Sequence, residues 1–98
     1  MAKLSVVVPV YNEERAVAAV LADLDAALRR APEIAAFEIL VVDDGSTDGT
    51  ARAVQAAAEG RPAVRLLARD RNRGYGSALK HGIRHAAHDL IAIVVGDR

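Results

Sequence analysis

Four short apolar runs, each rich in β-branched residues, are separated along this chain by segments with helical periodicity. The runs cover residues 4–10, 37–42, 64–68 and 90–95. A continuous apolar run of this length is typical of a strand buried on both faces, as in a parallel sheet. Strands that alternate with helices predict an α/β fold, an open doubly wound parallel sheet of the order βαβαβαβ.

The segments between the runs carry the signals of three helices. The first has a single apolar stripe at helical spacing, made of Val17, Val20, Leu21, Leu24, Ala27 and Leu28. We expect this helix to start after Asn12 as its N-cap, with Glu13 and Glu14 in the first turn, and to end before Pro32. The second helix is expected from about residue 48 to 59. The third is expected to bury Leu79, Ile83, Ala86 and Ala87.

Composition limits the class of protein further. The chain has 98 residues, which is the length of one domain, and 52% of them are hydrophobic, which excludes intrinsic disorder. Thirteen basic and thirteen acidic residues give zero net charge, so we expect no nucleic-acid partner. There is no cysteine, which excludes disulfides and thiolate chemistry. No apolar run reaches the ~20 residues of a membrane span or the core of a signal peptide, so we expect a cytoplasmic protein.

Polar clusters follow each apolar run at residues 11–14, 43–48, 69–76 and 96–98. The carboxyl ends of parallel strands share one edge of the sheet, and ligands of open α/β sheets bind outside that edge. The four clusters therefore predict one binding rim, although turn-forming residues also gather at strand ends for structural reasons alone.

Two charged patterns allow both a functional and a structural interpretation. The arginines of residues 69–73 precede a helix, where guanidinium groups and free backbone N–H groups suit a diphosphate, but a solvated charged loop fits equally well. Three histidines at helical spacing, His81, His85 and His88, have the appearance of a metal-binding stripe. A solvated helix face is the favoured interpretation, because no carboxylate or thiolate clearly joins them.

An Asp43–Asp44 pair after the second strand is misplaced for a receiver domain of a response regulator, where the acidic pair follows the first strand.

Three sequence segments resemble the inverting family 2 glycosyltransferases. They are residues 4–14 (LSVVVPVYNEE), 42–50 (VDDGSTDGT) and 72–79 (NRGYGSAL), in the order and spacing of that family. The third segment is most similar to the branch that glycosylates polyprenyl or dolichyl phosphates. The resemblance covers nearly the whole chain and implies a GT-A fold, whose Rossmann-like nucleotide-binding half corresponds to the predicted doubly wound sheet.

The resemblance also implies a set of residues that bind a UDP- or GDP-linked sugar. Pro9, Tyr11 and Glu13 would line the nucleoside pocket. Asp44, or less favourably Asp43, would accept a hydrogen bond from the base, and Arg73 would face the diphosphate. Asp97 would bind Mg²⁺ or Mn²⁺, although the family expects Asp-x-Asp there and Val95 takes the place of the first carboxylate.

The resemblance predicts the donor-binding half of a metal-assisted inverting transferase, with a lipid phosphate as the acceptor of the complete protein. We expect residues 1–98 to be one nucleotide-sugar-binding domain and the N-terminal part of a longer transferase. The acceptor side and the catalytic base would then lie elsewhere, so no catalytic residue is assigned. The alternative is a nucleotide-binding or regulatory module without catalysis. Residues 90–95 would form an uncovered edge strand, which favours self-association.

Overall fold

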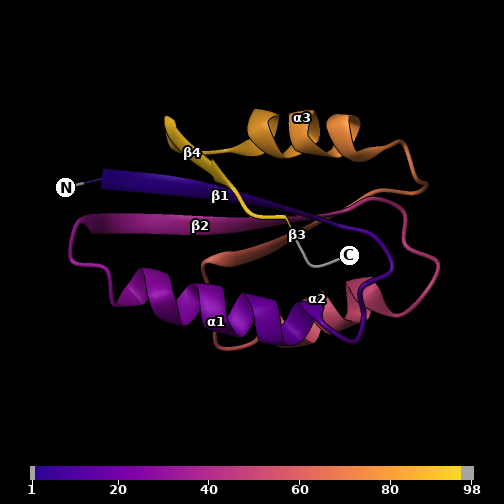
Figure 1. Ribbon diagram of the computed structural model, residues 1–98, viewed down its shortest axis with the longest axis horizontal. Helices are drawn as coiled ribbons and strands as arrows, with labels where there is room; N and C mark the ends of the chain where they lie inside the picture. The colour runs from indigo at the N-terminus through magenta and orange to yellow at the C-terminus, as the bar shows by residue number, and fades with distance from the viewer. Residues whose placement is uncertain (1, 96–98) are drawn as a thin grey trace.

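The computed structural model describes residues 2–95 and contains one four-stranded sheet in which every strand pair is parallel. The strands are β1 (Ala2–Val10), β2 (Ile34–Asp43), β3 (Val64–Ala68) and β4 (Leu90–Ile93), in the spatial order β3-β2-β1-β4. The chain runs outward from β1 to β3 and then crosses back to place β4 on the other side of β1 (Figure 1). This confirms the predicted doubly wound α/β fold, with its switch point beside β1.

Helices cover both faces of the sheet. α1 (Val17–Arg29) and α2 (Thr50–Ala58) lie on one face, and α3 (Tyr75–His85) lies on the other (Figure 1). Side chains of a strand alternate between faces, so the β-branched runs supply two cores. Val6, Val8 and Val41 belong to the core under α1 and α2, whereas Val7 and Val42 pack under α3.

The first two helices begin later than the sequence predicts. Asn12 is not an N-cap, because it adopts a left-handed backbone with φ 51° and α1 starts only at Val17. Glu13 and Glu14 therefore precede the helix, and the first turn of α1 holds no carboxylate. The backbone N–H groups of Asn12 and Glu13 and the side-chain oxygen of Asn12 bind the segment after β2 instead of capping α1.

The third helix faces the sheet mainly with small residues; of the predicted stripe, Leu79 packs against the core under α3, whereas Ile83 does not. Ala78 and Gly82 are buried, whereas Ile83 is 42% exposed. A Cβ atom on Gly82 would lie 2.5 Å from Cγ1 of Val7, so only glycine permits this close approach. The helix therefore lies close to β1, and Ile83 is turned away from the core.

The described residues contain no helix that is long and apolar enough to cross a bilayer.

Candidate functional site

The loops that follow β1 and β2 are joined by hydrogen bonds at the carboxyl edge of the sheet. The N–H of Asn12 donates to Oγ of Ser46 at 2.9 Å, and Oδ1 of Asn12 accepts the N–H of Thr47 at 2.8 Å. The N–H of Glu13 donates to Oγ1 of Thr50 at 2.9 Å, at the start of α2. Asn12, Ser46 and Thr47 thus fix two loops to each other, which explains why these polar residues do not cap helices.

The two aspartates at the end of β2, Asp43 and Asp44, point to opposite faces of the sheet. Both are buried. Oδ1 of Asp43 accepts hydrogen bonds from the N–H and the hydroxyl of Ser46, which closes the turn on the α1–α2 side. Asp44 is directed to the α3 side, because successive side chains of an extended chain alternate.

Asp44 holds the start of α3 in place. Its Oδ1 accepts the N–H of Arg73 at 3.1 Å, and its Oδ2 accepts the N–H of Gly74 at 2.9 Å. Nη1 of Arg69 lies 3.6 Å from Oδ1, and the side chains of Arg69 and Asp44 are only 9% and 6% exposed. The carboxylate therefore fixes the two residues that precede α3 and is the charge partner of a buried guanidinium.

The loop after β3 approaches the loop after β2 at Gly45. This glycine has φ +72°, and a Cβ atom there would lie 2.2 Å from the carbonyl carbon of Arg71. A side chain at position 45 would displace the backbone of residues 71–72, so the glycine is required by the contact between the two loops.

A pocket of about 160 Å³ opens between these loops and the first turn of α3. Its lining residues come from β1, from the loops after β1, β2 and β3, and from α3; they are Pro9, Val10, Tyr11, Asp44, Asn72, Gly74, Tyr75 and Ala78. Three residues that the resemblance pointed to, Pro9, Tyr11 and Asp44, thus lie around one hollow. Asn72 and Tyr75 join them, and both were visible in the sequence only as members of the third motif.

Glu13 and Arg73 lie beside the pocket rather than in its lining. Oε2 of Glu13 accepts the N–H of Tyr11 at 3.3 Å and so supports the end of β1. The guanidinium of Arg73 pairs with Asp70 at 3.1 Å on the surface of the same loop. Asp43 is directed to the other face of the sheet, and Asp97 lies outside the described residues.

The loop arginines do not share one role, although the sequence shows them as a regular alternation. Arg69 is directed inward, where its Nη2 donates to Oγ of Ser77 at 2.7 Å and its Nη1 has no hydrogen-bond acceptor within residues 2–95. Arg71 and Arg73 are exposed. Of the arginines at residues 69–73, Arg71 and Arg73 therefore present their guanidinium groups to solvent.

The pocket offers chemistry that suits a flat polar ring. Tyr11 and Tyr75 supply aromatic surface, and the buried Asp44 supplies a carboxylate. Four lone-pair sites are available on a carboxylate, and two backbone N–H groups occupy only part of them. A ligand that combines an aromatic face with an N–H edge fits this set of groups.

A larger hollow lies at the opposite, amino-terminal edge of the sheet, beside residues 2–3 and 87–90. Next to it, Glu38 accepts the hydroxyl of Ser5 at 2.7 Å, the N–H of Ala87 at 2.6 Å and Nη1 of Arg65 at 3.2 Å. Burial raises the pKa of Glu38, but these hydrogen bonds outweigh it and lower the pKa from its usual 4.5. The network joins the α3–β4 loop to the sheet, and nothing in the sequence pattern indicated it. Because ligands of open α/β sheets bind at the carboxyl edge, the smaller pocket is the candidate site.

The histidines do not form a metal centre. The rings of His81 and His85 lie 4.5 Å apart, and the N–H of His88 donates to Oγ of Ser5. Burial and the nearby positive charges of His85, Arg69, Arg84 and Arg73 lower the pKa of His81. Within residues 2–95 no group of three or more His, Cys, Asp or Glu side chains could hold a metal ion. The described residues alone therefore do not provide a site for the divalent cation that the resemblance implies.

A family model and the curated relatives of this chain indicate the same protein family. Residues 5–97 match the family described as glycosyl transferase family 2. The chain is 40% identical over 97 residues to undecaprenyl-phosphate 4-deoxy-4-formamido-L-arabinose transferase of Sodalis glossinidius, covering 97% of this chain and 29% of that protein. It is 43% identical over 94 residues to a dolichyl-phosphate beta-glucosyltransferase of Trichomonas vaginalis, covering 93% and 28%.

A solved structure agrees with these relatives. The mannosyltransferase of Pyrobaculum calidifontis, in complex with GDP-Man and Mn²⁺, superposes with a TM-score of 0.74 at 33% identity. The match covers 96% of this chain and 27% of that one. The chain thus spans less than a third of the length of these relatives.

Proposed function

Because the chain belongs to glycosyl transferase family 2, we propose that its carboxyl-edge pocket binds the nucleoside of a nucleoside-diphosphate sugar. The observation that carries this proposal is the buried carboxylate of Asp44 in a pocket that also contains Tyr11 and Tyr75. A base would pack against the aromatic surface and donate its ring N–H to Asp44. Uracil and guanine both present such an N–H, so a UDP- or GDP-linked donor fits.

The diphosphate would lie toward the start of α3 and the exposed part of the preceding loop. No side chain caps the N-terminus of α3 within the described chain, and the first-turn N–H groups of a helix favour an anion. Arg71 and Arg73 are exposed next to this helix end. The ion pair of Arg73 with Asp70 is a surface pair and contributes little, so the guanidinium is available to a phosphate.

Asp97 remains the candidate ligand for Mg²⁺ or Mn²⁺. A divalent cation would neutralise charge on the leaving diphosphate when bound. With Val95 in place of a second carboxylate, the contribution of the metal to affinity is expected to be small. The named activities of the two curated relatives support a lipid phosphate as the acceptor of the whole protein.

Titration calorimetry of UDP and GDP into this chain tests the proposal. Asp44→Asn should weaken binding about ten- to hundredfold, since a hydrogen bond to a charged group contributes roughly 1.5–3 kcal/mol. Tyr75→Ala should weaken binding by removing aromatic surface, whereas Gln55→Ala, an exposed change on α2, should have no effect. Asp97→Ala should weaken nucleotide binding when Mn²⁺ or Mg²⁺ is present, and should leave it unchanged when a chelator removes the metal. Equal affinity in all four variants and the wild type would contradict the assignment of the pocket.

We also propose that the chain associates with itself through β4. Within the described residues β4 pairs only with β1, which leaves one side of its backbone unpaired. Leu90, Ile93 and Val95 are 54%, 46% and 49% exposed along this edge. An apolar edge strand is a ready template for pairing with another strand.

A further inference from the structure

The positive charge of this neutral chain is concentrated on one side of the sheet. Residues 69–89, which join β3 to β4, contain five basic side chains and two carboxylates, Asp70 and Asp89, which gives a formal charge of +3 with the histidines neutral. The five are Arg69, Arg71, Arg73, Lys80 and Arg84. All but Arg69 are exposed, so the outer surface of this segment has a clear excess of positive charge.

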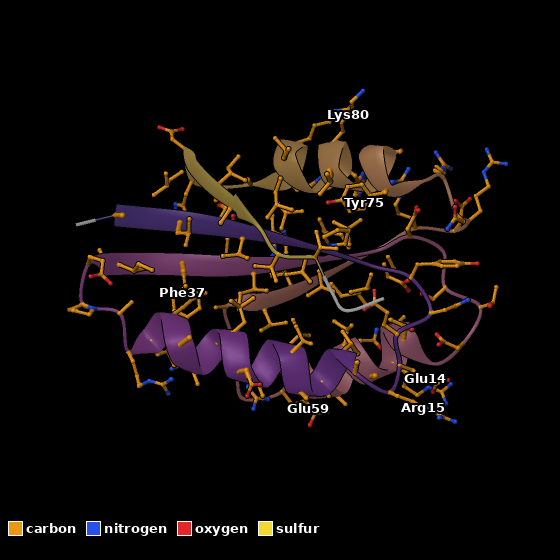
Figure 2. The ribbon with its side chains drawn as sticks, viewed as in Figure 1. Glu14, Arg15, Phe37, Glu59, Tyr75 and Lys80 are labelled. Atoms are coloured by element: carbon orange, nitrogen blue, oxygen red, sulfur yellow. The ribbon has the colours of Figure 1, made fainter. Side chains whose placement is uncertain are left out.

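The opposite side of the sheet has mixed charge. The exposed charged residues around α1 and α2 are five carboxylates (Glu14, Asp23, Glu33, Asp48 and Glu59) and four arginines (Arg15, Arg29, Arg30 and Arg52). Figure 2 shows Lys80 on the outer side of α3, at the top of the view. Glu14, Arg15 and Glu59 lie at the bottom of the view, on the side of α1 and α2. The charge asymmetry therefore follows the two layers of the fold.

The outer face of α3 also carries apolar surface among the charges. Ala78 and Gly82 contact the sheet, so a period of 3.6 residues places Lys80, Ile83 and Arg84 on the solvent side. Ile83 is 42% exposed beside these two basic side chains. Basic residues with an aliphatic side chain among them are typical of surfaces that adsorb to anionic lipid headgroups.

We propose that the outer face of α3 (Lys80, Ile83 and Arg84), together with Arg71 and Arg73 of the preceding loop, docks on the anionic phospholipid surface of a bilayer. The basic side chains contact lipid phosphates, while Ile83 inserts among the headgroups. The face is continuous with the rim, since Arg71 and Arg73 belong to both. Docking would hold the nucleotide pocket near the membrane surface, where a lipid-phosphate acceptor resides. This consequence for the acceptor rests on the proposed function, whereas the docking itself does not.

Co-flotation with vesicles tests the proposal. The chain should float with vesicles of phosphatidylcholine containing phosphatidylglycerol, but not with phosphatidylcholine alone, and 0.5 M NaCl should release it. Each basic side chain near an anionic surface changes partitioning by about fivefold. The double variant Lys80→Gln, Arg84→Gln should therefore lose roughly 25-fold in partitioning.

A matched control removes the same charge from the other layer. Arg30 and Arg52 are exposed on the α1–α2 side, so Arg30→Gln, Arg52→Gln should leave flotation unchanged. Ile83→Ser should weaken flotation at constant charge. Equal loss in both double variants, or no preference for anionic vesicles, would overturn the proposal. Tighter binding to single-stranded RNA than to vesicles, with the same dependence on Lys80 and Arg84, would overturn it as well and assign the face to nucleic acid.

Failure of docking and failure of the proposed function are separate results. Lys80 and Arg84 do not line the pocket, so UDP and GDP titration of the double variant should match the wild type. A chain that binds nucleotide but ignores anionic vesicles keeps the proposed function and contradicts the docking. A chain that floats with anionic vesicles but binds no nucleotide supports the docking and contradicts the proposed function.

Discussion

The carboxylate of Asp44 accepts the backbone N–H of Gly74 at 2.9 Å, across thirty positions of sequence. With the bond to Arg73 and the nearby guanidinium of Arg69, this contact makes one side chain both a wall of the pocket and the anchor of α3. The site and the fold are therefore coupled at this residue.

Removal of the Asp44 carboxylate should destabilise the chain strongly. Asp44→Ala leaves Arg69 buried without its charge partner, and breaking a buried pair typically costs about 3–5 kcal/mol. Urea denaturation should show this loss, whereas Asp23→Ala, at an exposed aspartate on α1, should cost much less. Similar midpoints for the two variants would mean that Asp44 does not anchor α3.

Two glycines of α3 should respond to alanine in opposite directions. Gly82→Ala forces a Cβ atom against Val7 and should destabilise the chain by roughly 1–3 kcal/mol through overpacking. Gly76 has open space at the Cβ position, so Gly76→Ala should stabilise the helix by up to about 1 kcal/mol. Thermal denaturation of both variants checks the pair, and a stabilising Gly82→Ala would contradict the close packing of α3 on β1.

Acid should destabilise the chain partly through Glu38. Hydrogen bonds lower the pKa of this carboxyl below its usual 4.5 in the folded state. Its contribution to stability is thus fully present above pH 4.5 and is lost as the pH falls through the lowered pKa. Between pH 7 and pH 3, Glu38→Gln should lose less stability to acid than the wild type, with the exposed Glu59→Gln as control. Parallel stability curves for the wild type and Glu38→Gln would exclude this role.

Association through β4 should depend on concentration and on the apolar edge. Light scattering should show species larger than a monomer at high concentration, and Ile93→Lys should shift them toward the monomer because a charged edge resists pairing. A wild type that stays monomeric throughout would contradict this part of the proposal.

The strands and their order of alternation could be predicted from the sequence because buried parallel strands leave continuous apolar runs. The starts of the helices could not be predicted in this way. The N–H of Asn12 donates a hydrogen bond to the hydroxyl of Ser46 on the neighbouring loop, so neither residue caps the helix nearest to it. The exposure of Ile83 was missed for a related reason, since Gly82 lets the helix approach with its small side. The family resemblance selected Pro9, Tyr11 and Asp44, which line one pocket, whereas the contacts of Asp44 with Arg69 and Gly74 are tertiary and leave no local pattern.

The most direct test follows backbone amide signals of this chain by NMR while UDP or GDP is added. Binding at the carboxyl edge predicts shifts at Val10, Tyr11, Asp44, Gly74 and Tyr75, which surround the pocket. Lys3, Ala87 and Asp89, which surround the larger hollow at the other edge, should stay unchanged. Shifts confined to that second group, or no shifts with either nucleotide at millimolar concentration, would contradict a nucleotide site at the carboxyl edge.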